Sequence, residues 1–388
     1  MNPRQPLRLP FLDGVRGLAA LYVVVYHAYC TSDCSTLGWR HTLPPLLEKL
    51  LRWLLHGHLA VCIFIVLSGF CLMLPVATHP ERRLAGGAGR YFARRARRIL
   101  PPYFGAVIVS LALIAIVPGL GTPADVYWDS ALPAFRADVL LSHLFLYFNL
   151  DPALSSKINY PLWSVATECQ IYFFLPLLIL PLWRRLGLAA SVVAASVAGL
   201  LPHFLFAGRH DVASLHFLGL FALGAAGAVL GVSQDAGRRI PWGLCALAAW
   251  VPLALAMQFR HEVFVTWRQT MDFAVGLATM ALLIYGAHGA RQEEKSGSLV
   301  MRIFEAPATM WLGAISYSLY LIHAPVLASL HIVTRHLALN STATLAVLMT
   351  VGVPLALLAA YGFHLVCERP FLVARPGRAA TGAMPALP

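Results

Sequence analysis

Three ionisable side chains lie inside one apolar stretch, FLDGVRGLAALYVVVYH: Asp13, Arg16 and His27. A charge in hydrocarbon costs about 3 kcal/mol on insertion scales, so membrane proteins keep such residues for a pathway, a partner or chemistry. On one helix Arg16 and His27 share a face, about 16 Å apart along the axis, and Asp13 can pair with Arg16. A histidine placed there can act as a general base. The alternative is that Arg16 snorkels to headgroups and His27 is a structural histidine.

A carboxylate, Glu168, lies in a second apolar stretch, PLWSVATECQIYFFLP, with no Lys or Arg within one helical turn. Its charge must be met from another helix or removed by protonation. If Glu168 reaches the depth of His27, the carboxylate would fix the histidine tautomer and raise its basicity. We take a pairing of His27 with Glu168 as a hypothesis.

A dense basic run, RRARRILPPYF, begins at Arg94 and ends in a proline pair that would start the third apolar stretch. Such a run commonly anchors a membrane protein on its cytoplasmic face. Arginine also binds phosphate in a bidentate manner, so an anionic cosubstrate could dock there from the cytoplasm. Composition alone favours the anchor.

Further polar side chains lie in the segment WLGAISYSLYLIHAPVL. Ser316, Tyr317 and Tyr320 fit hydrogen bonding between helices, whereas the role of His323 stays open.

No metal site is expected. His56 and His58 come at the start of the second apolar stretch without a nearby acidic or cysteine ligand, and the seven cysteines show no zinc spacing. Cys30 and Cys34 could form a disulfide if their side of the membrane is periplasmic, or stay as two buried thiols.

These side chains must be positioned by membrane-spanning helices. Apolar residues make up 59% of the 388 positions, charged residues 12%, and the mean hydropathy is +0.70, which excludes a water-soluble domain. A span needs about 20 mostly apolar residues. Ten such segments occur, at 11–31, 53–77, 100–119, 160–183, 188–206, 213–232, 241–258, 271–289, 309–331 and 342–366. The sequence therefore predicts an all-α integral membrane bundle of about ten transmembrane helices.

Shorter features complete the expected architecture. The apolar stretch 139–149 is too short to span and predicts a re-entrant or interfacial helix. We expect one membrane domain over residues 1–372 and a disordered cytoplasmic tail over 373–388. The first apolar segment is expected to be a retained span, because no small-residue cleavage site follows it.

The basic residues indicate orientation. With the N-terminus inside, 19 of the 29 Lys and Arg residues fall in inner segments and 9 in outer loops, while Arg16 lies within the first span. The positive-inside rule then places both termini in the cytoplasm. Because the basic residues lie between apolar runs, the net charge of +12 does not indicate nucleic-acid binding.

Taken in order, these motifs resemble the membrane-bound acyltransferase family 3, which includes O-acetyltransferases of bacterial O-antigen and exopolysaccharide and macrolide acyltransferases. The match runs from one end of the chain to the other. It comprises LDGVRG with Arg16 and His27, VLSGF at 66–70, Arg95 and Arg98 before Pro101, PLWS with Glu168 and Gln170, LGAISYSLYLIHAPV, and a closing CERPF.

The resemblance implies a role for each of these residues. His27 would be the catalytic base, with Arg16 and Glu168 also essential, and Arg95 and Arg98 would bind acyl-CoA together with Arg16. This chain has Cys169 where many relatives carry a second acidic residue, which speaks against a mechanism that needs two carboxylates.

We therefore expect an O-acyltransferase of the bacterial inner membrane that moves an acyl group, foremost acetyl, from acyl-CoA to a hydroxyl of a carbohydrate or macrolide acceptor. No cofactor would be bound permanently. The candidate substrate-binding residues are Trp163, Ser164, Tyr320 and His323. A transporter or flippase that uses the same ionisable residues is the alternative. A noncatalytic scaffold would leave them unexplained.

Overall fold

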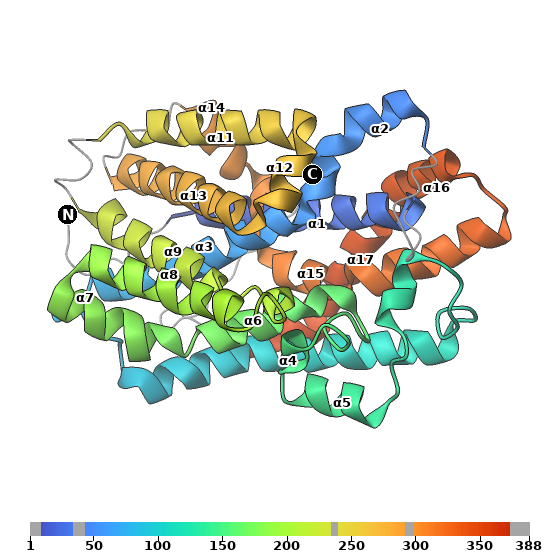
Figure 1. Ribbon diagram of the computed structural model, residues 1–388, viewed down its shortest axis with the longest axis horizontal. Coiled ribbons are helices and arrows are strands. Elements are labelled where there is room, and N and C mark those ends of the chain that lie inside the picture. The colour runs from blue at the N-terminus through green and yellow to red at the C-terminus, as the bar shows by residue number, and fades with distance from the viewer. Residues whose placement is uncertain (1–8, 34–42, 234–239, 292–297, 373–388) are drawn as a thin grey trace, which may run out of the picture.

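The computed structural model describes residues 9–33, 43–233, 240–291 and 298–372. Within these ranges the chain is helical, without a strand. Ten helical segments are long and apolar enough to cross a membrane, and they run side by side along the long axis of the molecule (Figure 1). The predicted all-α, ten-span bundle is confirmed. The expected tail over 373–388 and Cys34 lie outside the described residues.

The spans are built from single and composite helices. Single helices form α1 (Phe11–Asp33), α4 (Gly87–Ile116), α8 (Leu188–Leu205), α9 (Phe217–Val232), α11 (Trp242–Phe259), α13 (Arg268–Arg291) and α15 (Pro307–His336). Three spans are composite. One joins α2 (Pro45–Leu51), η1 (Arg52–His56) and α3 (Gly57–Ala77), and a second joins α6 (Trp163–Ile171), η5 (Leu175–Ile179) and α7 (Leu180–Leu186). The third joins α16 (Ser341–Val347), η7 (Leu348–Gly352), α17 (Val353–Phe363) and η8 (His364–Glu368). Short helices α12 (His261–Thr266) and α14 (Leu299–Phe304) connect spans.

The third span begins earlier than the sequence predicted. Helix α4 starts at Gly87, so the basic run from Arg94 lies on the helix, and Pro101 and Pro102 fall inside it. Arginine has a high helix propensity, and membrane helices tolerate internal proline. As a result, Arg95 and Arg98 are held on one face of a helix rather than in a loop.

Glycines let the central helices approach closely. A Cβ added to Gly313 of α15 would lie 2.1 Å from the Asp13 carbonyl oxygen of α1, and one added to Gly224 of α9 would lie 1.9 Å from the Val66 carbonyl oxygen of α3. Small residues at such crossings allow backbone-to-backbone packing. The two contacts fix α1 against α15 and α3 against α9, and α1 carries Arg16 and His27.

The apolar stretch before the fourth span forms α5 (Ala137–Leu144) and a turn, η3 (Phe148–Leu150), beside α4 at the edge of the bundle (Figure 1). Helix α5 is too short to span, as expected, and exposes Leu140, Leu141 and Leu144. Asn149 Nδ2 lies 3.0 Å from both Thr167 Oγ1 and Gln170 Oε1. These bonds hold α6, and with it Glu168, in place.

Candidate active site

Two cavities lie side by side within the bundle. The first, here called the arginine cavity, has a volume of about 110 Å³ and is lined by residues that include Arg16, Arg95, Arg98 and Glu168. The second, the histidine cavity, has a volume of about 750 Å³ and is lined by residues that include His27, His58, Tyr160, Trp163, Arg268 and Asp272. Val61 and Tyr320 line both cavities, so the two spaces meet at these side chains.

His27 is almost fully buried and is held by a second histidine. Its Nδ1 lies 2.8 Å from His323 Nε2, and His323 Nδ1 lies 3.0 Å from the Leu319 carbonyl oxygen. A carbonyl only accepts, so a neutral His323 carries its proton on Nδ1 and accepts at Nε2. His27 must then donate from Nδ1. In this assignment the Nε2 of neutral His27 is unprotonated, and its lone pair can act as a base or a nucleophile.

Glu168 does not pair with His27, so the predicted His27–Glu168 dyad is wrong. Its carboxylate accepts a hydrogen bond from Ser68 Oγ at 2.5 Å and another from the Tyr172 hydroxyl. The span begins at the level of His27, where the Tyr160 ring centroid lies 4.9 Å from that of His27. Glu168 follows Tyr160 by eight residues, or about 12 Å along the helix axis, and therefore lines the arginine cavity. Ser68 belongs to α3, whereas Tyr172 follows α6 directly in the same span as Glu168.

The predicted arginines converge. Arg16 Nη1 pairs with Asp13 Oδ1 at 2.9 Å, as expected, and Nη2 lies 3.7 Å from Cys71 Sγ. Arg95 has a buried Nε–H with no hydrogen-bond partner among the described residues. Arg98 lines the same cavity. Three guanidinium groups around one small space form a site suited to a phosphate-bearing ligand.

The four candidate substrate-binding residues take different positions. Trp163 lines the histidine cavity, and Ser164 lines the arginine cavity. Ser164 Oγ lies 2.6 Å from the Tyr320 hydroxyl, which also donates to the Pro161 carbonyl oxygen at 3.0 Å. Tyr320 therefore also joins helices, as its sequence context indicated. His323 is fully buried and contacts His27, which supports a role in positioning His27.

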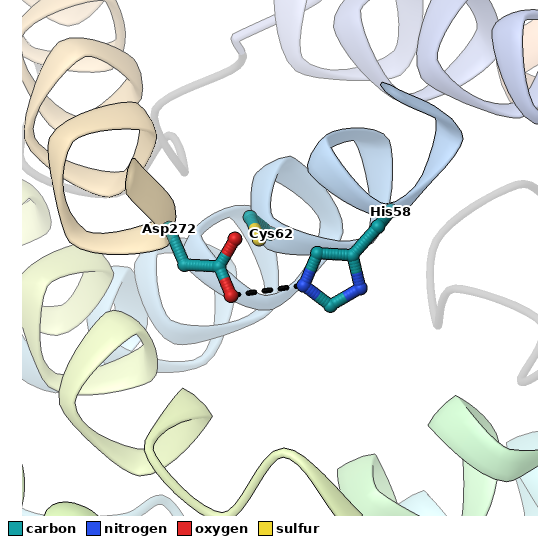
Figure 2. Close-up of side chains that lie close together, drawn as sticks. All are labelled: His58, Cys62 and Asp272. Atoms are coloured by element: carbon teal, nitrogen blue, oxygen red, sulfur yellow. Dashed lines mark hydrogen bonds and ion pairs between the residues drawn. The ribbon is translucent and has the colours of Figure 1, made fainter. Parts of the chain in front are cut away.

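Sequence reasoning missed one cluster at the wall of the histidine cavity, which His58 and Asp272 line. The side-chain atoms that could bind a metal ion in His58, Cys62 and Asp272 lie within 4.8 Å of one another (Figure 2). The expectation that His58 has no acidic or cysteine neighbour was therefore wrong. Cys62 follows His58 by one helical turn, and Asp272 is an acidic residue inside a predicted span. Both signals were present in the sequence.

Comparisons with known proteins identify the family of the chain. A family model described as an acyltransferase domain, family 3, matches residues 9–364. The peptidoglycan O-acetyltransferase OatA of Listeria monocytogenes is 24% identical over 343 residues, which cover 82% of this chain and 49% of the relative. A Staphylococcus aureus protein named "Putative O-acetyltransferase" is 23% identical over 349 residues, covering 83% of this chain and 51% of that protein.

The chain spans about half the length of these curated relatives. A Komagataeibacter xylinus protein named "Putative membrane-bound transacylase BcsY" is 27% identical over 201 residues, covering 48% of this chain and 42% of that protein. No solved structure matches the chain. The family match covers nearly every described residue, including those that line both cavities. The chain belongs to the acyltransferase 3 family, and ten of its described helical segments are long and apolar enough to cross a membrane.

Proposed function

We propose that the protein transfers an acyl group, foremost acetyl, from acyl-CoA to a hydroxyl of a carbohydrate or macrolide acceptor, with His27 at the reacting centre. One observation carries the proposal. The hydrogen bonds from Leu319 through His323 to His27 leave Nε2 of His27 unprotonated, with a free lone pair. His27 also lines the histidine cavity, which meets the arginine cavity at Val61 and Tyr320.

The arginine cavity supports binding of the donor. Arg16, Arg95 and Arg98 would hold the phosphates of acyl-CoA, while the thioester extends past Val61 and Tyr320 to His27. Arg16 and His27 are eleven residues apart on an unbroken helix, or about 16 Å along its axis, so an extended ligand arm would follow α1. Glu168 lies among these cations, and we assign it to orienting the arginines rather than to proton transfer at His27.

Two routes of transfer fit the geometry at His27. As a base, Nε2 takes the proton of the acceptor hydroxyl while the oxygen attacks the thioester carbonyl and the C–S bond breaks. As a nucleophile, Nε2 takes the acyl group itself and then passes it to the acceptor. In both routes the CoA thiolate leaves and is finally protonated.

The histidine cavity supports binding of the acceptor. Its volume of about 750 Å³ lies within the range of small-ligand sites. Trp163 and tyrosines line it and offer apolar faces beside polar tips, a surface on which a sugar ring can lie. The relative named as a peptidoglycan O-acetyltransferase favours a carbohydrate. The cytoplasmic origin of acyl-CoA and the basic inner segments favour the inner membrane with both termini inside.

The test is transfer of radiolabelled acetyl from acetyl-CoA to envelope glycan in membrane vesicles. His27→Ala should abolish labelling, because the lone pair at the reacting centre is lost. His336→Gln removes an exposed histidine at the far end of α15 and should label like the wild type. Transfer by a correctly inserted His27→Ala protein would contradict the proposal. Movement of glycan across the membrane without acyl consumption would support the transporter alternative instead.

A further inference from the structure

Besides His27, the histidine cavity is lined by His56, His58 and His261, and the proposed chemistry uses none of these three imidazoles. His58 lies at the start of α3, next to Gly57. A Cβ added to Gly57 would lie 2.1 Å from Tyr26 Cδ1, so this turn of α3 packs directly on the turn of α1 that carries His27. His27 and His58 therefore line one cavity from adjacent helices.

The hydrogen bonds of His58 define its tautomer. Its Nε2 lies 2.9 Å from Asp272 Oδ2, and His216 Nε2 lies 2.8 Å from the same oxygen (Figure 2 shows the first pair). An ionised carboxylate only accepts, so both imidazoles donate. The Nδ1 of neutral His58 then carries the lone pair. Arg268 Nη2 lies 3.4 Å from this Nδ1, a long contact that an incoming hydroxyl can replace.

Asp272 is suited to hold this ring. It is 1% exposed, and burial of a carboxylate requires polar partners, which His58 and His216 supply. A carboxylate that accepts from one ring nitrogen orients the imidazole and makes the other nitrogen more basic. Asp272 and His58 thus form the carboxylate–histidine pair that the sequence predicted for Glu168 and His27.

We propose that His58 is the base that deprotonates the acceptor hydroxyl, while His27 carries the acyl group. This inference rests on the proposed function. His27 Nε2 bonds to the thioester carbonyl carbon, the C–S bond breaks and the CoA thiolate leaves. The acceptor oxygen then bonds to the acyl carbon as its proton passes to His58 Nδ1, and the bond to His27 breaks. The departed thiolate takes a proton from the solvent, and His58 later returns its own proton to the solvent, so that the ester and the CoA thiol are the products.

The same atoms also resemble a metal site, because Cys62 completes a sulfur, nitrogen and oxygen donor set that zinc accepts. One observation favours the base. Asp272 Oδ2 already accepts hydrogen bonds from two imidazoles, His58 and His216. Metal binding is therefore an outcome that the test must detect.

The test uses the full chain in detergent, radiolabelled acetyl-CoA as donor and water as acceptor. His58→Gln removes the base but keeps an N–H donor for Asp272 near the position of Nε2. We expect this variant to release its first equivalent of CoA at the wild-type rate and to keep the label on the protein. Later turnovers should slow on the order of 100-fold, as for loss of a general base. Asp272→Asn should likewise release its first equivalent of CoA at the wild-type rate, and its later turnovers should slow less than those of His58→Gln.

The matched control is Cys62→Ser, which changes the cluster without touching the base and should turn over like the wild type. Steady turnover of His58→Gln at the wild-type rate, or absence of label on that protein, would overturn the inference. Stoichiometric zinc in the purified protein that is lost in Cys62→Ser would overturn it too. Retention of label by His27→Ala would instead overturn the proposed function, whatever His58 does.

Discussion

At the scale of single residues, Arg95 gives the strongest indication of a bound anion. Its Nε–H is buried and has no partner in the part of the chain that the structure describes, and Arg16 and Arg98 line the same cavity. A buried donor without a partner costs about 1–3 kcal/mol, and more for a charged group. A phosphate oxygen of the donor would remove this cost.

Arg95→Gln should therefore raise the KM for acyl-CoA by about 10- to 100-fold, the effect of losing a hydrogen bond to a charged group. The KM for the acceptor should not change. Arg94→Gln is the control, because Arg94 donates to the Ala85 carbonyl oxygen at 3.2 Å and does not line the cavity. Steady-state kinetics with varied acyl-CoA make the comparison. Equal changes in both variants would show that Arg95 acts only through the general positive charge.

The sequence predicted some of these residues and not others, for a physical reason. Arg16 and His27 share a face because they lie on one unbroken helix, and helical periodicity alone fixes that relation. The partner of His27 depends on which face of α15 turns toward α1. That contact joins positions 27 and 323, and no local pattern encodes it. The sequence identified Glu168 as a site residue but did not predict its hydrogen-bond partners, because the depth of α6 in the bundle depends on where its first turn begins.

At the scale of helices, the glycine crossings determine where the site residues meet. Gly17 and Gly313 bring α1 and α15 into backbone contact, and ten residues further along each helix His27 meets His323. The equal spacing shows that the two helices run parallel at this interface. The sequence predicted ten spans from length and hydropathy, but hydropathy does not say which of them are neighbours.

Gly313→Ala should destabilise the protein, because the added Cβ would lie 2.1 Å from a backbone carbonyl oxygen that has little freedom to move. We expect a loss of about 1–3 kcal/mol, as for overpacking of a core, with reduced acyl transfer. Gly289→Ala in α13 meets no atom within 4 Å and should be neutral or slightly stabilising. Thermal unfolding in detergent makes this comparison. Equal melting temperatures for the two variants would contradict the close crossing.

At the scale of the whole molecule, two cavities of different chemistry share the wall residues Val61 and Tyr320. One gathers cations, and the other gathers imidazoles and aromatic rings. This division fits a bisubstrate enzyme whose donor and acceptor enter different cavities and meet at His27. The sequence indicated Arg16, His27 and Glu168 but not Asp272 or the separation of the two cavities, because these depend on the packing of α1, α3, α6, α13 and α15.

A structure of the protein with a non-hydrolysable acetyl-CoA analogue would show whether a thioester held by the arginines reaches His27. We expect phosphates on Arg16, Arg95 and Arg98, and an acyl carbonyl carbon about 3–3.5 Å from His27 Nε2, the separation of a near-attack geometry. An acyl group that stops on the arginine side of Val61 and Tyr320, or that binds away from both cavities, would rule out transfer at His27.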